Sequence, residues 1–105
     1  MDFKIPAQKL GLDVEEYIEL IELFLETGGN DLKGFEDALA NNDTQTMAER
    51  SHSLKGAAGN LGLSEIYEKA KEIESRSRDN ALEGIENKVN EIKQNFKDIV
   101  AALES

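Results

Sequence analysis

The 105-residue chain has no cysteine and no tryptophan, and it has only one proline and one histidine. Without cysteine there is no disulfide framework, thiol nucleophile or thiolate metal site. A lone histidine cannot supply a zinc site, which needs several His or Cys ligands. Basic residues are also few, since 12 Lys and Arg against 22 Asp and Glu give a net charge of −10. That balance argues against nucleic acid and anionic membranes as partners, because both need a basic face.

Long hydrophobic runs are missing too. No apolar stretch approaches the roughly 18 residues of a membrane span, and no signal peptide is visible. No P-loop, glycine-rich nucleotide motif or calcium-binding loop occurs, and no nucleophile elbow suggests a Ser/His/Asp triad. We therefore expect a cytoplasmic protein with no metal, no cofactor and no nucleotide site of its own.

The residues that are present favour helices, because Leu, Ile and Ala dominate the apolar set. Helical spacing predicts a long first helix over about 13–27, ended by "TGGND", and then a shorter helix around 32–39. The next helix is expected to begin after an N-cap at Asp43 and to end at Leu61, with Gly62 in the left-handed C′ position.

Two further helices are predicted in the second half of the chain. Ser64 is expected to cap one helix, which "SRDN" ends, and "NALE" at 80–83 resembles a capping box for the last helix. Residues 3–11 are expected to add a short helix. Short connections between four substantial helices predict an all-α fold, an antiparallel up-down four-helix bundle with an additional short helix or helices. We expect one domain over 1–105, with a short lead-in over about 1–12.

The only histidine lies in "SHSLKGAAGNLG", residues 51–62. On a helical wheel of about 100° per residue, one face gathers a core stripe and His52 lies roughly 140° from its centre. The stripe is Met47, Ser51, Leu54, Ala58 and Leu61. Gly56 and Gly59 share the face of His52, although glycine inside a helix costs roughly 1 kcal/mol. We predict an exposed imidazole, with both glycines giving steric clearance to a partner.

Two charged residues complete the candidate site. Lys55 is a helical neighbour of His52, and a cation beside an imidazole suits an anion, most simply a phosphoryl group. Glu74 falls in the apolar stripe of the following helix, where a carboxylate needs a partner. His52 and Lys55 are the candidates, and a bond from Nδ1–H would fix the tautomer and leave Nε2 free for attack.

Each of these features also has an ordinary explanation. A lone exposed histidine is most often a surface residue, and paired glycines often serve a tight helix contact. Lys55 could simply be solvated, and Glu74 could reach the helix edge without a role. Their coincidence around the single histidine favours a functional interpretation.

The run from His52 to Gly62, H-S-L-K-G-A-A-G-N-L-G, followed by "KEIE" ending at Glu74, resembles the histidine phosphotransfer (HPt) domains of multistep phosphorelays. The helix pattern matches that family over nearly the whole chain. The resemblance implies a monomeric phosphocarrier in which His52 takes a phosphoryl group on Nε2. The donors and acceptors would be aspartates of response-regulator receiver domains, within pathways that start from a sensor or hybrid histidine kinase.

The resemblance also implies roles for individual residues. Lys55 matches the family's lysine beside the phosphohistidine, and Gly56 matches its glycine that clears space for the receiver. Glu74 matches a glutamate that bonds the imidazole in chemotaxis-kinase relatives. Ser51 stands where many members have alanine, and Lys71 replaces the histidine found in the chemotaxis kinases, so their full bonding network is not expected here. Mg²⁺ is expected on the partner receiver.

Two alternatives compete with this interpretation. The chain could supply the dimerisation and phosphoacceptor helices of a sensor histidine kinase, but those usually carry an acidic residue after the histidine, where Ser53 stands here. It could also be a structural helical adaptor in which the apolar stripe of the last helix, over residues 85–103, forms an intermolecular coiled coil. Both alternatives predict a dimer.

Overall fold

The computed structural model describes residues 1–105 and contains helices and connecting turns but no strand. The five helices are α1 (Lys4–Lys9), α2 (Val14–Ala40), α3 (Thr44–Asn60), α4 (Ser64–Arg78) and α5 (Ile85–Glu104). The predicted all-α class is confirmed, and α1 is the additional short helix.

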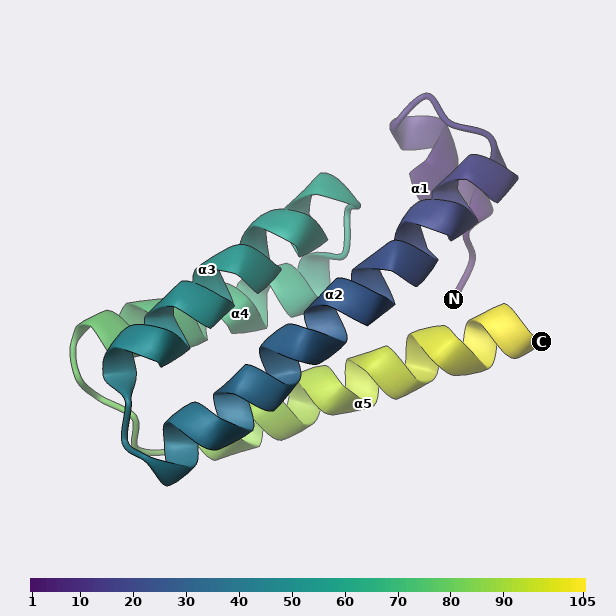
Figure 1. The fold of residues 1–105 in the computed structure, drawn as a ribbon. Coiled ribbons are helices and arrows are strands. Elements are labelled where there is room, and N and C mark those ends of the chain that lie inside the picture. Colours follow the sequence, from purple (N-terminus) through teal and green to yellow (C-terminus); the bar gives the residue numbers. More distant parts are fainter.

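Helices α2 to α5 run alternately up and down and form a four-helix bundle (Figure 1). Helix α3 packs between α2 and α4, while α5 contacts both α4 and α2. The short α1 packs on the N-terminal part of α2, near the end of the bundle where both chain termini lie (Figure 1). The predicted up-down bundle is therefore confirmed. None of the five helices has the combined length and apolarity that a membrane span requires.

The predicted break at "TGGND" is wrong, because α2 continues through it to Ala40. The reason is tertiary packing at Gly28. A Cβ there would lie 2.7 Å from Cζ of Phe96 and 3.2 Å from Cδ1 of Leu54. Glycine thus lets α2 approach α5 and α3 closely, and the ring of Phe96 packs against that of Phe24 with centroids 5.3 Å apart. This packing outweighs the helix-propensity cost of about 1 kcal/mol per glycine.

Both predicted ends of α3 are confirmed. The Asp43 side chain caps the helix by accepting a hydrogen bond from the Thr46 amide at 3.0 Å. Gly62, just past the C-cap, has a φ of +74°. That left-handed conformation carries little penalty only for glycine, so the chain turns tightly from α3 into α4.

The predicted starts of α4 and α5 are wrong in detail. Leu63 rather than Ser64 is the N-cap of α4, and no side chain caps that end. The "NALE" segment forms no capping box, because α5 begins only at Ile85, after a left-handed Gly84. Asn80 instead adopts a φ of +56° and accepts a hydrogen bond from the Thr44 hydroxyl at 3.0 Å. A tertiary contact between the start of α3 and the turn after α4 therefore replaces the local cap.

The core is one cluster contributed by all five helices. The stripe predicted on α3 lies inside it or beside it, since all five of its side chains are buried. The end of α3 is also tied to α2, because the buried Tyr17 hydroxyl donates a 2.6 Å hydrogen bond to the Leu61 carbonyl. These contacts fix the inner face of α3 and leave its outer face free to carry the site.

Candidate functional site

His52 projects from the outer face of α3, and its side chain is 65% exposed. The residue before it, Ser51, is fully buried and donates its hydroxyl to the Met47 carbonyl at 2.8 Å. The change from buried to exposed between neighbouring positions follows from the helical repeat of about 100° per residue. The predicted exposure of the imidazole is therefore confirmed.

Glu74 reaches His52 from α4. Its Oε2 lies 2.9 Å from Nδ1 of His52, and its Oε1 lies 2.6 Å from Nζ of Lys55. The carboxylate side chain is only 9% exposed. The structure thus brings together the three side chains that the sequence predicted would meet, and Glu74 has the partners that a buried carboxylate needs.

Arg78 is a fourth member of this cluster, and the sequence interpretation missed it. Its Nη2 and Nε lie 2.7 and 3.2 Å from Oε2 of Glu74, the same oxygen that faces the imidazole. Arg78 is four residues after Glu74, so both project from the same face of α4. That spacing is the signal in the sequence, but the segment "SRDN" around Arg78 predicts only the end of a helix.

The state of the Glu74 carboxyl determines the tautomer of His52. Burial alone would raise the pKa of Glu74, but hydrogen bonds from Lys55, Arg78 and His52 outweigh it and lower the pKa from 4.5 to about 2. Glu74 is therefore ionised at neutral pH and can only accept hydrogen bonds. In the neutral ring Nδ1 must carry the hydrogen, so the lone pair lies on Nε2, the nitrogen not engaged by Glu74.

The two glycines beside His52 have different surroundings. A Cβ added at Gly56 would meet no atom within 4 Å, so the space over this position is open. A Cβ at Gly59 would lie 3.2 Å from Cδ2 of Tyr67 on α4, which is tighter than an ordinary contact. Gly59 thus has a packing reason within the bundle. The expected clearance for a partner has geometric support at Gly56 alone.

A second ion pair lies between α2 and α3. Asp31 is buried on α2, and its Oδ1 is 3.4 Å from Nη1 of Arg50. Burial raises the pKa of Asp31, although the neighbouring Arg50 opposes the rise. Gly34 makes room for this arginine, because a Cβ there would lie 2.7 Å from Arg50 Nε. The sequence alone does not predict this pair.

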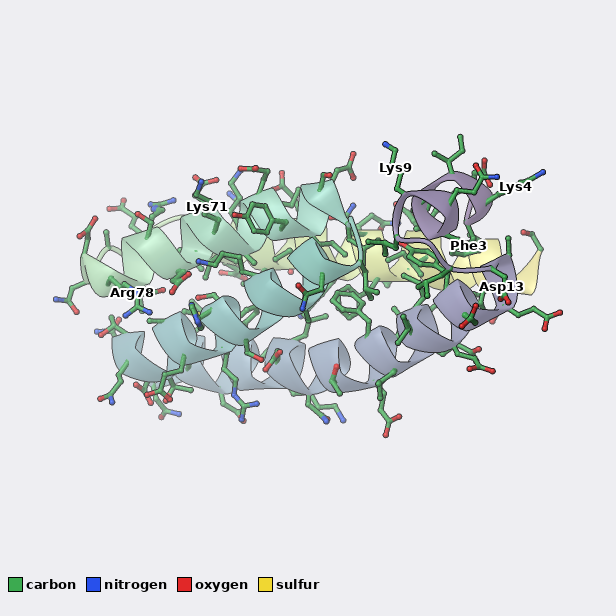
Figure 2. The ribbon with its side chains drawn as sticks, turned by 90° about the horizontal axis from the view of Figure 1, so that it is seen from above. Phe3, Lys4, Lys9, Asp13, Lys71 and Arg78 are labelled. Atoms are coloured by element: carbon green, nitrogen blue, oxygen red, sulfur yellow. The ribbon has the colours of Figure 1, made fainter.

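No group of three or more His, Cys, Asp or Glu side chains could hold a metal ion. Lys71 takes no part in the cluster around His52. It lies on α4 before Glu74 in the sequence (Figure 2). There it lines a polar surface hollow with residues of α4 and α5. The chemistry available at His52 is therefore that of a positioned imidazole, one buried carboxylate and two cations.

Comparison with known proteins identifies the family of this chain. No curated protein sequence matches the chain. The crystal structure of histidine-containing phosphotransfer protein B (HptB) from Pseudomonas aeruginosa PAO1 superposes with a TM-score of 0.84 at 22% identity. The match covers 99% of this chain and 90% of that one. At that identity the likeness establishes the fold.

The family model described as the Hpt domain matches residues 19–105. It spans α3 and α4 whole, and with them all four residues of the cluster around His52. The chain therefore belongs to the Hpt domain family and is a phosphotransfer carrier of phosphorelay signalling.

Proposed function

We propose that His52 is the phosphoacceptor of this carrier, taking a phosphoryl group from a receiver-domain aspartate or a kinase and passing it to another receiver aspartate. One observation carries the proposal. An exposed imidazole is bonded through Nδ1 to a buried, ionised Glu74, which leaves the Nε2 lone pair facing water. That arrangement is what nucleophilic attack on phosphorus requires.

Transfer to His52 exchanges one P–O bond for one P–N bond. The Nε2 lone pair forms a bond to phosphorus as the acyl phosphate P–O bond breaks, and the donor aspartate leaves as a carboxylate. Positive charge develops on the imidazole during attack, and the Nδ1–H of His52 shares it with the Glu74 carboxylate. Return transfer runs in reverse, since the acceptor carboxylate attacks phosphorus and the P–N bond breaks.

Lys55 and Gly56 assist in different ways. Lys55 is the cation next to the phosphoryl position and would stabilise its charge through a charge-assisted hydrogen bond. Its side chain is 25% exposed, so it can reach the solvent-facing side of His52. Gly56 leaves open space through which a receiver aspartate could approach in line.

The partners follow from the chemistry that this chain lacks. Receiver domains of response regulators would supply the aspartate, the acidic pocket and Mg²⁺, and a sensor or hybrid histidine kinase would supply phosphoryl groups to the pathway. The chain would act as a cytoplasmic monomer and not as an enzyme with a nucleotide site.

A structural adaptor is less well supported. The stripe along α5 that would have to form an intermolecular coiled coil is buried inside the bundle at Ile85, Val89, Ile92, Phe96 and Ile99. The kinase alternative is weakened by Ser53, which stands where those phosphoacceptor helices usually carry an acidic residue. Sedimentation provides the test, because both alternatives require a dimer and a carrier of this kind does not.

Replacement of His52 by glutamine tests the proposal directly. His52→Gln should keep the helix content and thermal stability, because the ring is mostly exposed and outside the core. The wild type should take acid-labile, base-stable label from a phosphorylated receiver or from phosphoramidate, and the variant should take none. Label that persists in His52→Gln would show that the acceptor is another residue.

A further inference from the structure

The cations bonded to Glu74 carry more positive charge than is needed to neutralise its single negative charge. Lys55 lies 2.6 Å from Oε1, while Arg78 and His52 both bond to Oε2 at 2.7 and 2.9 Å. Two full positive charges therefore share one carboxylate that is 9% exposed. One of the two is in excess of what neutralising Glu74 requires.

The two cations differ in where they can go. Lys55 is on α3, three residues after His52, and so is the helical neighbour whose ammonium a group carried on Nε2 could attract. Arg78 is the last residue of α4, on the same helix as Glu74 and four residues from it, with a side chain that is 60% exposed. Because Arg78 and Glu74 are an i, i+4 pair on one helix, their contact does not depend on a change at His52 or Lys55 on α3.

A phosphoryl group on His52 would compete with Glu74 for the ammonium of Lys55, because it carries about two negative charges near neutral pH. If Lys55 were the only counter-ion of Glu74, its departure would leave a buried carboxylate without a cation, which is costly. Arg78 removes that cost, since it already bonds to the oxygen that faces the imidazole.

Resting on the proposed function of His52, we propose that Arg78 is a positioning residue that serves as the standing counter-ion of Glu74, and so frees Lys55 to follow the phosphoryl group. Glu74 then keeps its hold on Nδ1 of His52 while Lys55 changes partner. Arg78 touches neither the phosphoryl group nor the reacting nitrogen, and it acts only through Glu74.

Phosphorylation by phosphoramidate tests this with no receiver present. Arg78→Ala should slow labelling of His52 by about three- to tenfold, because Lys55 is then retained by Glu74. Arg76→Ala removes the same charge from the same helix, at a side chain that bonds the Glu83 carbonyl instead of Glu74, and should change the rate by less than about twofold. Arg78→Lys keeps a cation near Glu74 and should restore most of the rate. Circular dichroism and thermal melting confirm that each variant folds.

The decisive comparison uses Glu74→Gln as the background. A neutral amide does not retain Lys55, so Arg78→Ala should have little further effect there, and the two substitutions should be strongly non-additive. Equal slowing by Arg78→Ala in both backgrounds would overturn the proposal, because Arg78 would then act on the phosphodonor directly. An unchanged rate in Arg78→Ala alone would also overturn it.

A second measurement does not depend on phosphorylation. A ¹³C NMR titration of the Glu74 carboxyl in Lys55→Ala should still give a pKa well below 4.5, because Arg78 remains, and adding Arg78→Ala should raise that pKa. A normal Glu74 pKa in Lys55→Ala would refute the role of Arg78. A wild type that takes no label would refute the proposed function of His52, and this titration would still decide what Arg78 does.

Discussion

Gly28 and Gly56 both lie inside helices, yet alanine should change the free energy of unfolding in opposite directions at the two positions. A Cβ at Gly28 would sit 2.7 Å from Cζ of Phe96 and 3.2 Å from Cδ1 of Leu54. A Cβ at Gly56 would meet nothing within 4 Å. The substitution is the same, so the difference between the two variants isolates packing from helix propensity.

Alanine is favoured over glycine in a helix interior by about 0.5–1 kcal/mol. Gly56→Ala should raise the free energy of unfolding by about that amount. At Gly28 the same gain is opposed by overpacking, which typically costs about 1–3 kcal/mol. The Phe96 ring cannot easily move away, because it is buried and packs against Phe24. Gly28→Ala should therefore lower the free energy of unfolding by about 0.5–2 kcal/mol.

Urea unfolding followed by circular dichroism measures both variants, and an unchanged m-value shows that the comparison is between similar folded states. For a domain of this size, 1 kcal/mol corresponds to a shift of roughly 4–8 °C in Tm. If Gly56→Ala were destabilised, the inference that a side chain fits at that position without a clash would be wrong. If Gly28→Ala were stabilised, the account of the continuous α2 would be wrong.

A bulky residue at Gly56 should block the approach of a receiver domain to His52. Gly56→Phe should fold with normal helix content and stability, because the position is open. It should slow transfer from a receiver by about a hundredfold, since a displacement of about 1 Å can have that effect on in-line transfer. Labelling by phosphoramidate, which needs little room, serves as the control. Normal transfer from a receiver would refute the clearance argument.

Two further predictions concern buried carboxyl groups. Because the pKa of Glu74 falls to about 2, its ionisation stabilises the fold above about pH 4.5, and this is lost as the pH falls towards 2. Glu74→Gln should therefore lower the free energy of unfolding by about 1–3 kcal/mol at pH 7, and the urea-measured difference should shrink in acid; a difference independent of pH would contradict this. Because burial raises the pKa of Asp31, its charged form is disfavoured in the fold, and Asp31→Asn should be neutral or raise Tm at pH 7. A clear fall in Tm would mean that the ion pair with Arg50 contributes more than the burial costs.

The sequence predicts best those features that depend on a single helix, such as which side chains it buries and which it exposes. Helical periodicity was enough to expose His52 and bury Ser51 one residue earlier, because the two positions differ only by rotation about one axis. It also placed Glu74 on the inner side of α4. The polarity of that position then predicted its partners, since a buried carboxylate requires cations.

The sequence predicts least well those features that depend on contacts between different elements. Gly28 looks like a helix breaker until Phe96, far along the chain, is known to pack against it. Gly59 looks equivalent to Gly56 until Tyr67 is placed beside it. Asn80 looks like a cap until its contact with Thr44 is known. In each case a contact with another element of the fold outweighs a local preference of about 1 kcal/mol or less.

The position of α3 between α2 and α4 has a consequence for how the phosphorylated state can be recognised. The inner face of this helix is fully packed, with Met47, Ser51, Leu54 and Ala58 inaccessible to solvent. Close-packed interiors do not deform continuously, so a group added on the opposite face has no soft element to displace. Only side chains would rearrange in response to the added charge. A partner that distinguishes the two states would then have to sense electric potential at the surface of α3 and α4 rather than a change of backbone shape, and its discrimination would weaken as ionic strength rises.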